Sequence, residues 1–184
     1  MDVATACQQT AGIVSGLLGN VDAGQLGSPT PCADWDVKAL TGHLVGGADM
    51  FAGMFGGESG AAPDGDLAGA ELAAAYDAAV GRLAAAAFAE GALDKTVSLG
   101  RMQMPGSAAL SLATADHLTH AWDLARATGQ PLEVPDELAA FALSSWQQMI
   151  QPPMRDGKMF GPEQQAQAGA SPMDRVAAFT GRTV

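Results

Sequence analysis

Apolar positions recur at three- and four-residue steps along most of the chain, which is the spacing of one face of an α-helix. Cap and stop residues flank most of these stripes: Asp, Ser or Pro stands where a helix can begin, and Gly where it can end. The pattern predicts helices from Asp2 to Gly19, from Asp36 to Gly56, from Leu72 to Gly91, from Ser107 to Thr128 and from Pro135 to Met149, with a last short helix between Ser171 and Gly181.

The connections between these stripes set the fold class. Residues 20–34 and 58–65 are rich in Gly and Pro, which indicates loops, and the weak alternation over Lys95–Met104 is the strand candidate. Long stripes joined by such loops predict an all-α fold, an antiparallel four-helix bundle with additional short helices and at most a short extended segment. At 184 residues the chain is expected to form one domain spanning 1–184.

Composition and charge exclude several classes of protein. Hydrophobic residues make up 48% of the chain, enough for a packed core, so global disorder is excluded. The net charge of -11 argues against nucleic acid and anionic membranes as partners. The longest apolar run, Leu83–Ala89, is far shorter than the roughly 20 residues that span a bilayer. A signal peptide begins with a positively charged region, whereas the first basic residue here is Lys38. We therefore expect a cytoplasmic protein, and we leave a homodimer open.

Candidate chemistry gathers on the second and fourth predicted helices. Asp116 and His120 are four residues apart, so their side chains leave the same face of one helix. His43 lies beside the apolar stripe of the second helix and could supply a third ligand. A carboxylate with imidazoles suits a divalent metal such as Zn, Ni, Fe or Mn. The alternative is that these histidines are ordinary residues at the edge of the core.

Three further residues have two interpretations each. His117 points about 60° away from His120 on a helical wheel, so it is a poorer metal ligand. It is instead a candidate for a residue that contacts the ligands without binding the metal. Asp123 could orient an imidazole, or it could pair with Arg126. Cys32 could be a reactive thiolate or a packed thiol, and an axial offset of roughly 10 Å places it too far from the metal of His43 unless its loop folds back.

Three separate motifs carry a resemblance to a known family. Residues 30–47, with Thr30-Pro-Cys and Trp35 leading to His43, and residues 116–129, with Asp116 and His120, resemble the actinobacterial DinB-like metal-binding proteins. These proteins are related to the N-terminal domain of mycothiol-dependent maleylpyruvate isomerase, and residues 171–182 resemble the closing signature of the same group. The resemblance implies a DinB-like bundle in which His43, Asp116 and His120 hold a divalent metal, with Asp116 standing where the isomerase pattern has Glu.

Three ligands leave positions on a metal open, which is typical of catalytic sites. Such a metal, with Zn favoured, could activate a small thiol or a water. The resemblance favours the thiol and implies a metal-dependent thiol S-transferase or isomerase with mycothiol as co-substrate. Its partners would be a small-molecule thiol and an electrophilic substrate, and Asp123 and His117 would support the ligands. Two alternatives stay open: a non-catalytic metal-binding or stress-response bundle, and a metal-free helical interaction module.

Overall fold

The computed structural model describes residues 1–32, 34–60, 65–157 and 160–184. Ala33, within the first motif, and residues 61–64, within a predicted connection, lie outside the described residues. In the described part, the elements in chain order are α1 (Val3–Leu18), η1 (Ala23–Gln25), α2 (Val37–Met54), α3 (Gly69–Ala87), η2 (Ala92–Asp94), β1 (Thr96–Leu99), β2 (Met102–Pro105), α4 (Gly106–Thr128), α5 (Asp136–Met149), η3 (Pro152–Met154) and α6 (Pro172–Phe179).

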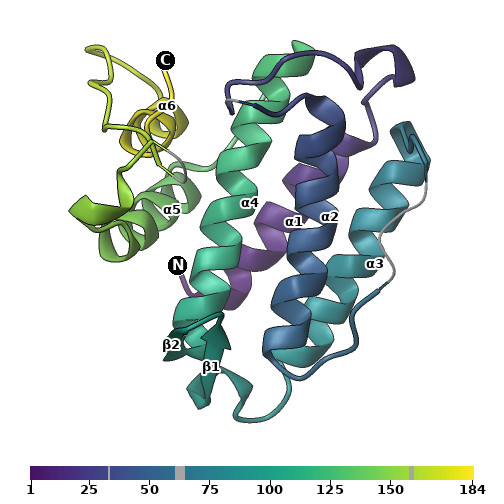
Figure 1. Cartoon of the computed structure of the whole chain (residues 1–184), viewed down its shortest axis with the longest axis vertical. Coiled ribbons are helices and arrows are strands. Elements are labelled where there is room, and N and C mark those ends of the chain that lie inside the picture. Colours follow the sequence, from purple (N-terminus) through teal and green to yellow (C-terminus); the bar gives the residue numbers. More distant parts are fainter. Residues whose placement is uncertain (33, 61–64, 158–159) are drawn as a thin grey trace.

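A bundle of α1, α2, α3 and α4 forms the body of the molecule (Figure 1). α1 and α3 run antiparallel, and so do α2 and α4, as predicted, whereas α2 with α3 and α1 with α4 run parallel. The ends of the helices show the parallel pairs. A side chain added at Gly57, just past α2, would meet Ala86 near the end of α3, and Gln130, just past α4, donates to the carbonyl of Leu17 at the end of α1. The connection between residues 55 and 68 is long enough to return the chain to the other end of the bundle. The all-α bundle itself is confirmed.

Side-chain capping accounts for the start of α1, α2 and α6. The side chains of Asp2, Asp36 and Ser171 each accept a hydrogen bond from a backbone N–H in the first turn of the helix that follows. The expectation that α4 begins with Ser107 as its cap is wrong, because α4 begins at Gly106 and Pro105, two residues before Ser107, occupies the cap position. Gly129 ends α4 in the left-handed conformation that glycine adopts without strain.

The strand candidate becomes a hairpin. β1 and β2 pair antiparallel, with Thr96 opposite Pro105 and Leu99 opposite Met102. Gly100 sits in the turn with a φ of +59°, which splits the predicted single strand into two. The hairpin lies at the end of the bundle where α4 begins (Figure 1).

α4 is the central element because it has neighbours on both sides. Its side chains pack on α1 and α2 within the bundle and on α5 and α6 outside it (Figure 1). Its buried residues therefore occur around the whole circumference of the helix, so polar groups on α4 lie between layers of the fold. In the described part of the chain, no helix combines the length and the apolarity needed to cross a bilayer.

Candidate metal centre

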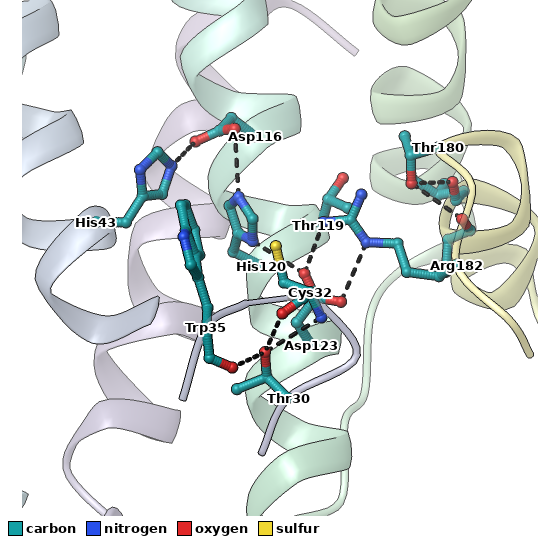
Figure 2. A network of polar contacts seen from close by, with 12 residues as sticks. Thr30, Cys32, Trp35, His43, Asp116, Thr119, His120, Asp123, Thr180 and Arg182 are labelled. Atoms are coloured by element: carbon teal, nitrogen blue, oxygen red, sulfur yellow. Dashed lines mark hydrogen bonds and ion pairs between the residues drawn. The ribbon is translucent and has the colours of Figure 1, made fainter. Parts of the chain in front are cut away.

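His43 and Asp116 face each other between α2 and α4. Nε2 of His43 lies 3.0 Å from one carboxylate oxygen of Asp116, and Nε2 of His120 lies 3.5 Å from the other. One potential donor atom from each of the three residues lies within 4.8 Å of the other two (Figure 2). The fold therefore brings together the three residues that helical spacing and the family resemblance singled out. We call His43, Asp116 and His120 the candidate triad.

The charges in the triad depend on one another. Burial opposes ionisation of Asp116, but the imidazoles of His120 and His43 outweigh it and hold the pKa of this carboxyl well below its usual range. Burial also lowers the pKa of His120, yet the carboxylates of Asp116 and Asp123 prevail and raise it to about 9. The site therefore favours a positive charge between two carboxylates.

Asp123 contacts the ring nitrogen of His120 that faces away from Asp116. One of its oxygens lies 2.9 Å from Nδ1 of His120, and Arg182 donates two hydrogen bonds to its carboxylate. The sequence left open whether Asp123 orients an imidazole or pairs with Arg126. In the structure it contacts the imidazole of His120, and Arg126 pairs with Asp174 instead. Burial raises the pKa of Asp123, but its bonds to His120 and Arg182 outweigh burial and lower the pKa overall.

His117 does not support the ligands in the way that the sequence suggested. Its Nδ1 lies 2.9 Å from the hydroxyl of Tyr76 on α3, so the hydrogen bond that it makes points away from the triad. Burial lowers its pKa to about 4, because the pull of Asp116 does not compensate for the loss of water. The reason is the rotation predicted from the helical wheel, which directs His117 toward the bundle core rather than toward the cleft.

A cleft of about 510 Å³ opens beside the triad. Cys32 lines it, and the thiol, His120 and Asp123 form a second group whose potential donor atoms lie within 4.8 Å of one another. The loop before α2 has therefore folded back, and the offset of roughly 10 Å expected for Cys32 from an extended approach does not apply. Burial raises the pKa of this thiol. The cleft is lined by Cys32, Asp34, Trp35, His43, Asp116, Thr119, His120, Trp146, Phe160 and Arg182.

Several residues of the cleft were not predicted from the sequence. Trp35 lies with its ring centroid 4.7 Å from that of His43 and 5.4 Å from that of His120. On the side of α5, Phe160 meets Trp146 edge to face. The indole N–H of Trp146 donates to Thr119, so its polar edge is satisfied and its ring forms an apolar wall. The contacts of Trp35 with His120 and of Trp146 with Thr119 join separate elements, which helical periodicity does not reveal.

The described residues fit a divalent cation. Two imidazoles and one carboxylate are ligands that Zn²⁺ and similar ions accept, and they converge from two helices. Without a metal, the raised pKa of His120 keeps a proton on Nε2, which faces Asp116. Because Nδ1 of His120 lies against Asp123, a cation that replaced this proton would find Nε2 already directed to the side of Asp116. Three protein ligands in an open cleft would leave room for a further small molecule on the ion.

A comparison with known protein families identifies the family of this chain. A family model described as the mycothiol maleylpyruvate isomerase N-terminal domain matches residues 7–125. The chain belongs to this family. The matched range contains His43, Asp116 and His120, and it ends well before Arg182.

The chain is also similar to individual proteins, in sequence and in structure. Two proteins of Mycobacterium tuberculosis, Uncharacterized protein MT0763 of strain CDC 1551 and Uncharacterized protein Rv0738 of strain H37Rv, are each 38% identical over 187 residues, covering 100% of both chains. Among solved structures, the mycothiol-dependent maleylpyruvate isomerase and a mutant of it align with TM-scores of 0.59 and 0.60 at 17% identity. The aligned part covers 76% of this chain and 65% of the isomerase chain. At this identity the likeness shows the fold, and the DinB-like family predicted from the motifs is confirmed.

Proposed function

We propose that His43, Asp116 and His120 bind a divalent metal, Zn²⁺ first and Ni, Fe or Mn as alternatives, and that the protein is a metal-dependent thiol S-transferase or isomerase. The observation that supports this most is the convergence of two imidazoles and one carboxylate from α2 and α4 beside an open cleft. Donors of this kind, arranged with room for another ligand, are typical of catalytic rather than structural metal sites.

The chain's own residues would prepare the site for a small thiol and an electrophile. When bound, the metal would supply a Lewis acid that lowers the pKa of a coordinated thiol. Asp123 holds the ring of His120 in one orientation, so the ligand does not need to reorganise. Trp35 and Trp146 contribute apolar surface to the lining of the cleft, against which the two reactants would pack.

The family and the fold neighbours suggest mycothiol as the thiol. The family is that of the mycothiol maleylpyruvate isomerase N-terminal domain, and the solved structures that share the fold are of a mycothiol-dependent maleylpyruvate isomerase. The cleft volume of about 510 Å³ falls within the range of small-molecule sites. The partners in this proposal are therefore a low-molecular-weight thiol and an electrophilic small molecule.

Metal analysis and a conjugation assay test the proposal together. Protein purified without an affinity tag is analysed for metal, and thiol-dependent turnover is then measured with mycothiol against a panel of electrophiles. Asp116→Asn should remove both metal and turnover because a neutral amide is a poor ligand. Asp77→Asn, at an exposed position of α3, is the matched control and should change neither.

The outcomes separate the three functional classes. Stoichiometric metal with thiol-dependent turnover in the wild type, both lost in Asp116→Asn, supports the enzyme. Metal without turnover would favour a non-catalytic metal-binding or stress-response protein. Neither metal nor turnover would leave the helical interaction module as the remaining class.

A further inference from the structure

Arg182 reaches the candidate metal centre from the far end of the sequence. Its Nε and one terminal nitrogen donate to the two oxygens of Asp123 at 3.1 Å and 2.7 Å, so both carboxylate oxygens are engaged (Figure 2). The Asp123 side chain is 0% exposed and that of Arg182 is 11% exposed. One oxygen of Asp123 also lies 2.9 Å from Nδ1 of His120. A continuous line of contacts therefore runs from Arg182 to the candidate ligand.

We propose that Arg182 is a positioning residue of the metal centre, which acts through Asp123 to fix the ring of His120. This inference rests on the proposed function, because it takes His120 as a metal ligand. A guanidinium that binds both oxygens of a carboxylate fixes the plane of that carboxylate as well as its position. A fixed acceptor in turn fixes the N–H of His120 on Nδ1, so Nε2 faces the side of Asp116, where a metal would replace its proton.

The backbone around Arg182 is held closely enough for such a role. The Arg182 N–H donates to the carbonyl of Ala177, which closes the chain back on α6. Gly181 has a φ of +99°, and a Cβ there would come within 2.8 Å of the backbone of Gly161. Two glycines thus permit a close backbone contact immediately before the arginine. The C-terminal segment is fixed against the rest of the molecule at the point where Arg182 enters the cleft.

The position of Arg182 also extends the site beyond the part of the chain that defines the family. The family model ends at residue 125, so it contains His120 and Asp123 but not the guanidinium that neutralises Asp123. Without Arg182, the buried carboxylate would keep its bond to His120 but lose the cation that binds both of its oxygens. A buried charge that loses its partner is costly, so its surroundings would rearrange and move the imidazole.

A second ion pair provides a control for a purely structural role. Arg126 on α4 donates to Asp174 on α6 at 3.0 Å, and its side chain is 54% exposed. This pair links α4 to the C-terminal part of the chain, as the pair of Arg182 with Asp123 does, but it leaves His120 untouched. If Arg182 serves only to hold α6 in place, then removing either arginine should have the same effect on metal binding.

The test is the Zn²⁺ affinity of the full-length chain, measured by competition with a chromophoric chelator. Arg182→Gln should weaken binding about 10- to 100-fold, as loss of support for a ligand commonly does. Arg182→Lys should fall between Arg182→Gln and the wild type, since lysine keeps the charge but not the two-point contact. Arg126→Gln should bind as the wild type does. In an Asp123→Ala background, Arg182→Gln should add no further loss, because the path through Asp123 is already broken.

Each outcome decides the inference. If the wild type binds Zn²⁺ and Arg182→Gln matches it, the inference is wrong and the proposed function stands. The same holds if Arg126→Gln weakens binding as much as Arg182→Gln does, because the role of Arg182 is then only structural. If the wild type binds no Zn²⁺, both fail. Circular dichroism shows whether each variant is folded. If Arg182→Gln does not fold, Arg182→Lys decides: weaker binding supports the positioning role, and affinity equal to the wild type contradicts it.

Discussion

At the scale of single residues, His117 and His120 show how one helix gives two histidines opposite properties. They stand three residues apart on α4, yet the pKa of His117 is lowered to about 4 and that of His120 is raised to about 9. Burial lowers the pKa of both. The difference arises because His120 lies between Asp116 and Asp123, whereas His117 is bonded to the uncharged hydroxyl of Tyr76.

This contrast predicts different outcomes for two alanine variants. His120→Ala should abolish Zn²⁺ binding, because one of three ligands is lost. His117→Ala should keep the metal but lower the free energy of unfolding by about 1–3 kcal/mol, because the buried hydroxyl of Tyr76 loses its partner. Zn²⁺ stoichiometry after dialysis and urea denaturation measure the two effects. Metal loss in His117→Ala with metal retained in His120→Ala would reverse the assignment.

The cysteines are predicted not to act as nucleophiles. Burial raises the pKa of both Cys7 and Cys32, so little thiolate forms near neutral pH. The Cys7→Ser/Cys32→Ser double variant should therefore keep its metal and its turnover with an added thiol. Metal analysis and the conjugation assay check this. Loss of turnover at unchanged metal content would instead point to Cys32, which lines the same cleft.

At the scale of elements, helix positions follow from the sequence better than helix directions do. The stripe and caps of α1 predict its bounds to the residue, because capping by Asp2 and the apolar spacing are local properties. The parallel run of α2 and α3 is not local. Periodicity shows which face of α3 is buried, and it carries no information on which end of the bundle the helix starts from.

The contact between α2 and α3 predicts a pH dependence. Arg82 on α3 binds both oxygens of Asp49 on α2, at 2.7 Å and 3.1 Å, and this bond lowers the pKa of Asp49. Because the pKa is lower in the folded state, the pair stabilises the protein above the ordinary pKa of about 4, and the gain disappears as the pH falls through the folded value.

Asp49→Asn should therefore reduce the free energy of unfolding by about 1 kcal/mol at pH 7, since water partly screens the partly exposed guanidinium, and by less near pH 3. Chemical denaturation of both proteins at the two pH values measures the difference. Asp136→Asn, at an exposed acid of α5, serves as the control. A deficit that stays constant between the two pH values would show that the charge of Asp49 is not what stabilises the contact.

At the scale of the whole molecule, the bundle is expected to fold without its metal. The core contains large apolar side chains on each of its four helices, including Leu18, Leu44, Tyr76 and Leu118, all fully buried. Removal of metal with a chelator should leave the far-UV spectrum unchanged and lower the melting temperature through the lost binding energy alone. Loss of helicity on chelation would show that the metal is structural.

Residues of the candidate site that lie close together in the sequence could be predicted to meet, and residues far apart in the sequence could not. Asp116 and His120 share one helical face, so their spacing alone joins them. His43 needed the resemblance to the family in addition to its position beside an apolar stripe. Arg182 contacts Asp123 across 59 residues of sequence, and Cys32 enters through a loop. Neither contact follows from periodicity, because both depend on how the elements pack.

X-ray absorption at the zinc edge shows directly whether His43, Asp116 and His120 together bind the metal. With Zn²⁺ bound and no small thiol present, we expect two imidazoles and otherwise oxygen ligands at about 2.0–2.2 Å. Asp116→Asn should abolish this signal by preventing the ion from binding. A sulfur ligand at about 2.3 Å would contradict the account, because it would place the metal on Cys32 with His120 and Asp123.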